Sequence, residues 1–201
     1  SFGVHVPVGP LPAARLPLAS VEPGPEVALL VGAGKPANRL PAALLAECAD
    51  ALNAAGRPCV VLGGPGDRFR ARDVLARCRV SAPRIACGQS IRASAEALQR
   101  VAAVVGPDTG PLHLARMLGR PVVAVFHAAD PARTGPLGYP GPAARVLQGS
   151  TLCAPCCASH CKLPGKPRTC LDRFSGAELA RAALELIAER SVQRLEPSPG
   201  P

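Results

Sequence analysis

Short apolar runs alternate with amphipathic stretches between residues 27 and 126. The apolar runs are rich in valine, leucine and alanine and are bounded by glycine, proline or charged residues, which is typical of buried strands. Strands are expected at Val27–Val31, Cys59–Leu62, Arg84–Cys87, Val101–Gly106 and Pro121–Phe126. The stretches between them carry apolar residues at helical spacing. Helices are expected at Pro41–Ala55, Asp67–Arg79, Ile91–Arg100 and Ser175–Arg190, with a short one starting near Gly110.

Strands and helices that alternate in this way predict an α/β fold with a doubly wound, parallel sheet and right-handed crossovers. The two ends of the chain differ from this pattern. Residues 1–25 are rich in proline and are expected to form a linker or extension. Residues 26–190 are expected to form the folded domain, and residues 191–201 a disordered tail.

The turn Pro107-Asp108-Thr109-Gly110 lies between a predicted buried strand and a predicted helix. Ligands of open α/β sheets bind at the carboxyl ends of strands, and the unpaired N–H groups of a helix start favour a phosphate or diphosphate. Thr109 can cap the helix, while Gly110 allows close approach or a positive φ.

Asp108 and His113 carry the remaining chemistry of this turn. A carboxylate repels a bare phosphate, so Asp108 is expected to accept hydrogen bonds from sugar hydroxyls or to hold a divalent cation. His113 can donate a hydrogen bond to a diphosphate oxygen. The alternative is structural: Asp108 and Thr109 cap the helix, and His113 packs beneath it.

The net charge of +9 rests almost entirely on arginine. The arginines are scattered and are not interleaved with aromatic residues, so no nucleic-acid partner is expected. A positive face suits anionic nucleotide sugars and anionic lipid headgroups equally well. No apolar run approaches the length of a membrane span, and no signal-peptide pattern opens the sequence, so a cytoplasmic location is expected.

A longer pattern surrounds the turn. It consists of Asp108-Thr109-Gly110-Pro111-Leu112-His113-Leu114-Ala115, then Gly119-Arg120-Pro121, Phe126, Asp130-Pro131 and Thr134-Gly135-Pro136. These residues at these spacings resemble the signature of glycosyltransferase family 9, the ADP-heptose:lipopolysaccharide heptosyltransferases. The likeness covers residues 27–190. It implies that Asp108, Thr109, Gly110 and His113 bind the diphosphate and sugar of the donor.

The resemblance also implies an architecture. The family's enzymes have two Rossmann-like domains that face each other across a cleft, the GT-B arrangement. This chain resembles the carboxyl-terminal, donor-binding half, and the half with the acceptor surface and the proposed catalytic base has no counterpart. The isolated chain is therefore expected to bind a donor without transferring its sugar.

The loop after the first predicted strand departs from the family. In family members this loop ends in Lys-x-Trp-Pro, and the lysine contacts a donor phosphate. Here Asn38 and Leu40 occupy the lysine and tryptophan positions. Lys35 or Arg39 could supply the lost charge, because both side chains are long and arginine binds phosphate in a bidentate manner. The alternative is that both are solvent-facing charges beside a turn.

Two further loops follow predicted strands and are expected on the ligand face. Asp67 matches a position where family members often present an acid to ribose hydroxyls, although it could equally be a helix N-cap. The segment Gly88-Gln89-Ser90 matches the one whose backbone meets the nucleotide base. Gln89 and Ser90 are therefore expected donor contacts, with a capped helix as the alternative.

The cysteines divide into two sets. Cys48, Cys59, Cys78 and Cys87 fall singly on predicted helices and strands, where small buried side chains are expected. A second set is clustered, and it resembles a cysteine pattern of many family members: Cys153, Cys156, Cys161 and Cys170, with Cys157 and His160 between them. In a reducing compartment these four suit a structural zinc or iron site that pins a long loop, and both the bound and the metal-free state remain open.

The leading functional reading is the donor domain of an inverting heptosyltransferase-like enzyme. It is expected to bind ADP-heptose or a similar nucleotide sugar for transfer to a lipopolysaccharide-core acceptor, with no cofactor for the chemistry and with peripheral contact at the cytoplasmic face of the inner membrane. Positive groups would neutralise the departing nucleoside diphosphate. Two alternatives stay open: a family member with another donor or acceptor, and a non-catalytic binding or assembly module.

Overall fold

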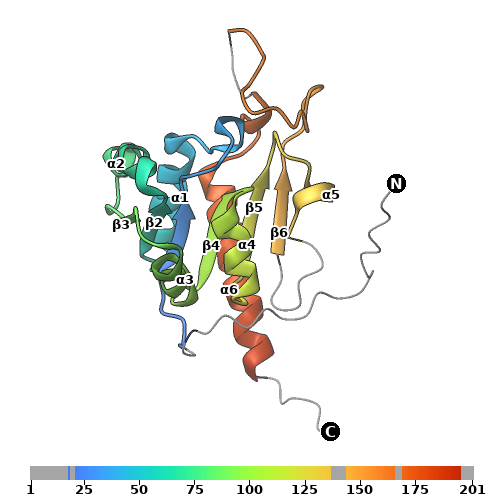
Figure 1. Ribbon diagram of the computed structural model, residues 1–201. Coiled ribbons are helices and arrows are strands. Elements are labelled where there is room, and N and C mark those ends of the chain that lie inside the picture. The colour runs from blue at the N-terminus through green and yellow to red at the C-terminus, as the bar shows by residue number, and fades with distance from the viewer. Residues whose placement is uncertain (1–17, 19–20, 137–143, 166–168, 196–201) are drawn as a thin grey trace, which may run out of the picture.

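The computed structural model describes residues 18, 21–136, 144–165 and 169–195 (Figure 1). Its strands are β1 (Val27–Leu30), β2 (Cys59–Gly63), β3 (Arg84–Cys87), β4 (Ala103–Pro107), β5 (Val122–Phe126) and β6 (Ala144–Gln148). Its α-helices are α1 (Ala42–Ala54), α2 (Arg68–Arg77), α3 (Ile91–Gln99), α4 (Gly110–Met117), α5 (Pro131–Thr134) and α6 (Gly176–Leu195). Short 3-10 turns are η1 (Pro36–Asn38), η2 (Pro65–Asp67) and η3 (Thr169–Leu171).

The six strands form one parallel sheet in the order β3-β2-β1-β4-β5-β6. β1 lies between β2 and β4, so Val27 is in register with Cys59 on one side and with Ala103 on the other. The strands β2 and β3 follow on one side of β1, and β4, β5 and β6 follow on its other side. The boundary between β1 and β4 is therefore the switch point, where loops diverge and leave a crevice.

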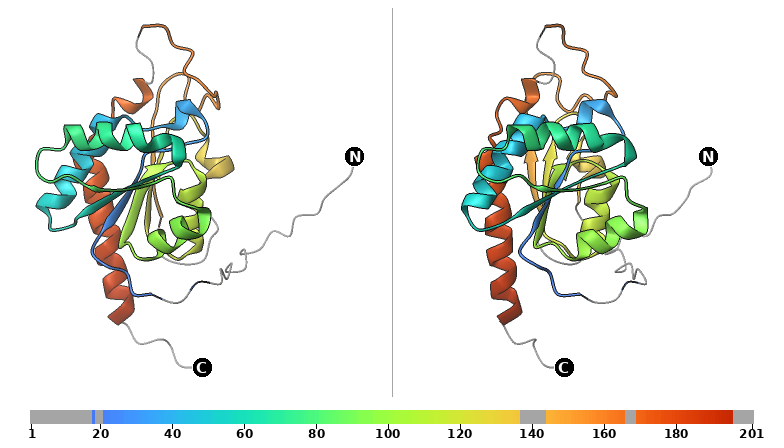
Figure 2. Two further views of the ribbon diagram at one scale, coloured as in Figure 1. Left: turned by 60° about the vertical axis from the view of Figure 1, so that its left-hand side comes forward. Right: turned by 90° about the vertical axis from the view of Figure 1, so that its left-hand side faces the viewer.

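Helices cover both faces of the sheet (Figures 1 and 2). Successive side chains of a strand point to opposite faces, so Leu29 packs in one core cluster and Leu30 in the other. The first cluster joins the sheet to α1, α2 and α6, and the second joins it to α3 and α4. Burial on both faces explains why the central strands are continuous apolar runs without polar alternation. The predicted α/β fold with a doubly wound, parallel sheet is confirmed.

Gly106 in β4 lies unusually close to a side chain of the neighbouring strand. A Cβ atom at this position would be 2.7 Å from Leu30 Cβ, closer than side-chain atoms can pack. Glycine is therefore required there by the close approach of β1 and β4. The same two strands lead into the loops at the switch point.

The structure differs from the sequence-based expectation at the sheet edge and at the carboxyl end. β6 was not predicted, because its side chains are only partly buried and its composition is not apolar throughout. α6 continues to Leu195, so the expected tail boundary at residue 191 falls inside the helix. Residues 196–201 and most of the expected linker at 1–25 lie outside the described residues.

Candidate functional site

The loops that follow β1 and β4 meet at the switch point of the sheet. The loop after β1 contains η1, which ends at Asn38. The loop after β4 is short, because α4 begins at Gly110 directly after Asp108 and Thr109. A third segment, α5, follows β5 and ends at Thr134. The topology thus brings three loops with distant sequence positions to one place.

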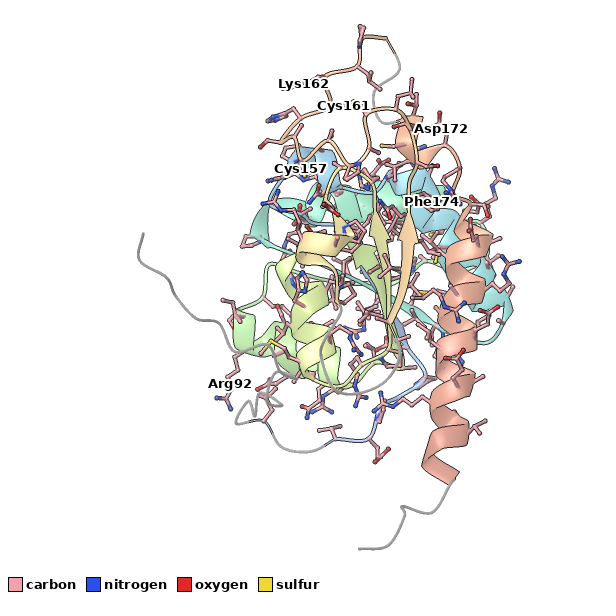
Figure 3. The ribbon with its side chains drawn as sticks, turned by 90° about the vertical axis from the view of Figure 1, so that its right-hand side faces the viewer. Arg92, Cys157, Cys161, Lys162, Asp172 and Phe174 are labelled. Carbon is pink, nitrogen blue, oxygen red and sulfur yellow. The ribbon has the colours of Figure 1, made fainter. Side chains whose placement is uncertain are left out.

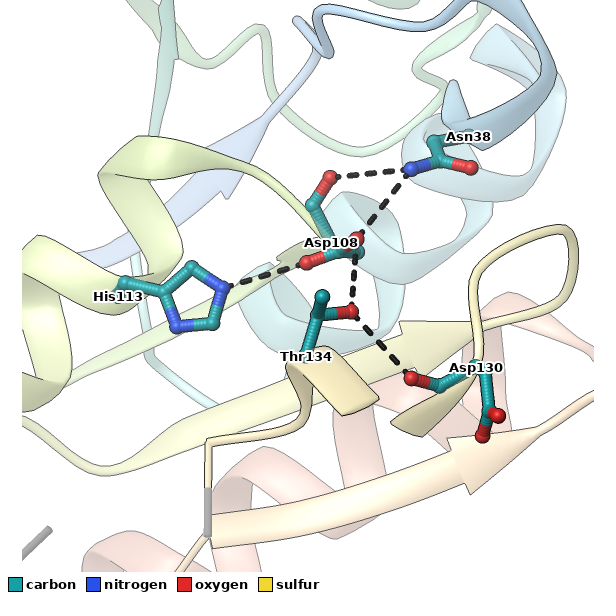
Figure 4. A network of polar contacts seen from close by, with 5 residues as sticks. All are labelled: Asn38, Asp108, His113, Asp130 and Thr134. Atoms are coloured by element: carbon teal, nitrogen blue, oxygen red, sulfur yellow. Dashed lines mark hydrogen bonds and ion pairs between the residues drawn. The ribbon is translucent and has the colours of Figure 1, made fainter. Parts of the chain in front are cut away.

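Asp108 is the centre of a polar network that draws on all three loops (Figure 4). His113 Nε2 donates to Asp108 Oδ1 at 3.2 Å, and Thr134 Oγ1 donates to Asp108 Oδ2 at 3.2 Å. Asn38 Nδ2 lies 3.4 Å from Asp108 Oδ2 and 3.5 Å from its carbonyl oxygen. Thr134 Oγ1 is also 3.3 Å from the carbonyl of Asp130. The carboxylate is partly buried and is held from three directions.

The first turn of α4 lies directly beside this carboxylate. Thr109 is the N-cap residue, but its side chain makes no capping hydrogen bond, contrary to the expectation that it would. Its carbonyl instead accepts hydrogen bonds from the N–H groups of Leu112 and His113. Gly110 has open space around it, with nothing within 4 Å of where a Cβ would lie. Pro111 has no N–H, so the N–H of Gly110 and the positive end of the helix dipole are the features of this helix start that favour an anion.

A pocket of about 460 Å³, here called the apolar pocket, opens beside the start of α4. It lies between α3 and α4 and reaches the loop after β2. Its lining includes Leu62, Gly63, Gly64, Pro65, Gln89, Ile91, Ser94, Leu98, Gly110, Pro111 and Leu114. Its walls are mainly apolar, with Gln89 and Ser94 as side chains that can hydrogen-bond. A pocket of this size and character suits a small planar ligand group.

Two other residues that were predicted to contact the donor form hydrogen bonds within the protein. Lys35 Nζ lies 3.4 Å from the carbonyl of Cys157, and Arg39 Nε donates to the carbonyl of Ala33 at 3.2 Å. Neither side chain forms an ion pair with Asp108 within the described parts of the chain. The structure therefore uses both residues to fasten the loop after β1. Their predicted contact with a donor phosphate stays a prediction.

Asp67 and Ser90 each stabilise their own loop. Asp67 Oδ2 accepts the N–H of Gly64 at 2.9 Å, and the carboxylate packs closely against Gly32, where only a glycine fits. Ser90 Oγ accepts the N–H of Ala93 at 3.2 Å and so caps α3. Gln89, between the two loops, lines the apolar pocket. Of these three predicted donor contacts, Gln89 is the one that faces a ligand-sized space.

The cysteine loop, residues 150–165, packs against the loops after β1 and β5. The N–H of Cys157 donates to the carbonyl of Ala128 at 2.7 Å, and the N–H of Ala37 donates to the carbonyl of Ser159 at 2.9 Å. His127 is buried, and its Nε2 donates to the carbonyl of Ala37. Figure 3 shows Cys157 and Cys161 in this loop at one end of the molecule. Main-chain contacts thus hold the loop and, through Ala37, support the neighbouring Asn38.

The predicted metal site is not assembled in this arrangement. Cys153 and Cys156 are exposed, whereas Cys161 and Cys170 are partly buried. Burial raises the pKa of the Cys170 thiol, and nearby Cys153, Cys156 and Cys161 add to the rise, so the four sulfurs lie in one neighbourhood. Even so, no set of three or more potential ligands in the described residues is arranged to hold a metal ion. Main-chain hydrogen bonds hold the loop in this arrangement, and a metal site at these four cysteines stays a prediction.

Two findings missed by the sequence reasoning complete the site. Thr134 was named as part of the sequence pattern and was not identified as a partner of Asp108. The apolar pocket could have been anticipated from the helical spacing of Ile91, Ser94 and Leu98 beside the glycine-rich loop after β2.

None of the helices in the described part of the chain combines the length and apolar character needed to cross a bilayer.

Comparison with known structures gives the same fold. A glycosyltransferase of family 9 from Veillonella parvula shares 25% identity, with a TM-score of 0.68 over 86% of this chain and 48% of that one. ADP-heptose lipopolysaccharide heptosyltransferase II from E. coli shares 23% identity, with a TM-score of 0.69 over 87% and 49%. The chain therefore spans about half the length of these proteins. No curated protein sequence matches it.

A third similar structure carries a metal. TibC from enterotoxigenic E. coli, described as an iron-containing dodecameric heptosyltransferase in complex with ADP-D-β-D-heptose, shares 16% identity. Its TM-score is 0.60 over 88% of this chain and 47% of that one. The model of glycosyltransferase family 9 (heptosyltransferase) matches residues 13–166, most of the sequence. The chain therefore belongs to glycosyltransferase family 9.

Proposed function

We propose that this chain binds the nucleotide-sugar donor of a heptosyltransferase-like reaction. The observation that carries the proposal is the position of the apolar pocket. Gly110 and Pro111 belong both to its lining and to the start of α4, and Asp108 lies just before them. An apolar pocket, a helix amino terminus and a carboxylate follow one another in the order of the base, diphosphate and sugar of one ligand.

In the proposed complex, the base lies between α3 and α4 against Ile91 and Leu114, with Gln89 and Ser94 available to its polar edge. The diphosphate lies at the first turn of α4, where N–H groups and the helix dipole favour negative charge. The sugar lies against Asp108, whose carboxylate accepts hydrogen bonds from hydroxyl groups. Each part of the ligand thus meets a chemically matched surface.

The proposed contribution to catalysis is electrostatic. The sugar leaves a nucleoside diphosphate, on which negative charge develops. The N–H of Gly110 and the positive end of the α4 dipole stabilise that charge without needing to move. Asp108 and His113 are assigned to donor binding, so a base that activates an acceptor hydroxyl for inverting transfer has to come from outside this site. We therefore propose that this chain by itself holds a donor and does not transfer the sugar.

We propose ADP-heptose or a similar nucleotide sugar as the donor and the lipopolysaccharide core or a related molecule as the acceptor. Membership of the family supports this, as does the similarity to the E. coli heptosyltransferase II and to TibC with its bound ADP-heptose. The net charge of +9 supports work at the anionic cytoplasmic face of a membrane.

A different sugar donor or acceptor within the same family is the second candidate. Asn38 favours it, because a neutral amide lies against Asp108 where family members carry a lysine. The site therefore has one cation fewer near the donor than the family pattern implies. This difference changes which donor is bound and leaves the donor-binding role itself intact.

Calorimetry of this chain with ADP, ADP-heptose, GDP and UDP tests the proposal. We expect ADP-heptose to bind and Asp108→Ala to weaken that binding roughly tenfold or more, because a hydrogen bond to a charged group is worth about 1.5–3 kcal/mol. Asp73→Ala is the matched control, since Asp73 is an exposed carboxylate of α2 that pairs with Arg77. The proposal fails if no nucleotide binds, or if both substitutions have the same effect.

A further inference from the structure

The contacts of Asp108 are made mostly by uncharged groups. Asn38 offers an amide and Thr134 a hydroxyl, and both reach the same oxygen, Oδ2. His113 reaches the other oxygen, Oδ1. Over the described ranges, no lysine or arginine lies within ion-pairing distance of this carboxylate. The carboxylate is therefore oriented by neutral donors on one side.

Asn38 is a buried residue whose side-chain amide contacts Asp108. The residue is 6% exposed, and its Oδ1 is buried without a hydrogen-bond partner among the described residues. Figure 4 shows that oxygen pointing away from Asp108, while the amide nitrogen points toward it. Burying an amide with one unmet acceptor costs free energy. The contact with Asp108 offsets that cost within the described structure.

The short helix α5 positions the Thr134 hydroxyl against the same carboxylate oxygen of Asp108. Asp130 Oδ1 accepts the N–H of Ala132 and so caps α5, which orients the short helix. At the end of α5, Thr134 Oγ1 lies between Asp108 Oδ2 and the carbonyl of Asp130. A hydroxyl carries one proton, so it donates to one of these acceptors at a time. The shorter and charged acceptor, Asp108, is favoured.

Taken together, these contacts occupy Oδ2 from the side of β1 and α5. Among the described residues, His113 contacts Oδ1, and an oxygen of a carboxylate can accept a further hydrogen bond. We propose that Asn38 and Thr134 are positioning residues that fix the Asp108 carboxylate so that it recognises the sugar of the donor and not its nucleotide. The inference rests on the proposed donor-binding function and assigns its sugar selectivity to two residues that do not themselves touch the ligand.

The test measures how much the sugar adds to binding, expressed as the ratio of the dissociation constants of ADP and ADP-heptose. Thr134→Val removes the hydroxyl and keeps the shape. We expect it to lower the ratio about tenfold while the affinity for ADP stays within about twofold, since one hydrogen bond to a charged acceptor is lost. Thr134→Ser restores the hydroxyl and should restore the ratio. Thr151→Val is the matched control, because among the residues that the structure describes the Thr151 hydroxyl is hydrogen-bonded to the thiol of Cys153 alone.

Asn38→Asp supplies a readout that a loss of packing does not mimic. It places a carboxylate against Asp108, so at neutral pH the two charges repel and the ratio falls. In acidic solution one proton shared by the two carboxyl groups returns a donor to the contact, so the ratio should recover. Wild-type protein measured over the same pH range provides the reference.

The outcomes separate the two proposals. If wild-type protein binds neither ADP nor ADP-heptose, the proposed function is wrong. If wild-type protein binds both and Thr134→Val leaves the ratio unchanged, or weakens ADP and ADP-heptose equally, the positioning role is wrong and donor binding stands. A pH-independent loss in Asn38→Asp also rejects the positioning role. Thermal unfolding of each variant establishes that the protein measured is folded.

Discussion

At the scale of single residues, Gly106 and Asp108 show how closely the core and the site are joined. Gly106 permits the side chain of Leu30 to lie against β4, and Asp108 follows one residue after the strand ends. Leu30 is itself the last residue of β1 and is almost completely buried. The packing of these two strands therefore sets the spacing of the loops that carry Asn38 and Asp108.

Gly106→Ala is expected to destabilise the protein. The new Cβ would lie 2.7 Å from Leu30 Cβ, so β1 and β4 must separate, and overpacking of this kind costs about 1–3 kcal/mol. Urea unfolding followed by circular dichroism measures the change in the free energy of unfolding. Gly34→Ala is the control, because nothing lies within 4 Å of that position, and equal stability of the two variants would contradict the argument.

The residues of the site were predictable where they are close in sequence. Asp108, Gly110 and His113 could be identified together, because a strand end, a tight turn and a helix start have a recognisable pattern. Their contacts with Asn38 and Thr134 could not be deduced, since those residues come from other loops. Which side chain of a loop turns toward a neighbouring loop depends on tertiary packing. That packing cannot be deduced from the local pattern of a single sequence.

At the scale of elements, the start of α3 shows how one serine can be assigned two roles. Ser90 was expected to contact the donor, with helix capping as the alternative, and the structure supports the cap. α3 also presents Ile91 and Ser94 to the apolar pocket. The cap therefore affects the site indirectly, by fixing where this helix begins.

Ser90→Ala is expected to lower the free energy of unfolding by about 1 kcal/mol, because the N–H of Ala93 loses its acceptor. Ser90→Thr retains a hydroxyl and should lose less. Ser81→Ala, at an exposed position outside the helices, serves as the control in the same urea titrations. A cap role is excluded if Ser90→Ala unfolds at the same urea concentration as wild type.

Most elements could be predicted because buried parallel strands and amphipathic helices have strong sequence patterns. The prediction failed for β6, which is a partly buried edge strand, and for the short segments η1 and α5. Those short segments are shaped by proline and by local hydrogen bonds more than by hydrophobic spacing. They also carry Asn38 and Thr134, so the least predictable elements hold part of the candidate site.

At the scale of the whole molecule, several thiols are buried in the core between the sheet and its helices. Burial raises the pKa of Cys59 from 9.0 to about 12, with the neighbouring Cys78, Glu26 and Asp50 adding to the shift. Burial likewise raises the pKa of Cys48 well above its usual range. The folded protein therefore holds these protons at a pH where the unfolded chain releases them.

The stability of the protein is consequently expected to fall in alkaline solution. The contribution of each thiol is complete below about pH 9 and is lost as the pH rises toward 12, because only the unfolded state ionises in that range. Between pH 8 and pH 10 the loss should be about 1 kcal/mol for each thiol. Urea unfolding at both pH values measures it, and Cys59→Val should reduce the loss. An equal loss in wild type and variant would show that Cys59 does not take part.

The switch point between β1 and β4 has a consequence for folding. Asn38, Asp108 and Thr134 come from the segments after β1, β4 and β5, which meet only after β4 and β5 have been added to β1. No fragment of the domain contains the complete set of contacts in its local sequence. The Asp108 network is therefore a cooperative property of the assembled strands β1, β4 and β5. Loosening β1 from β4 anywhere along their length is therefore expected to disturb the contact between Asn38 and Asp108, even at a distance from these two residues.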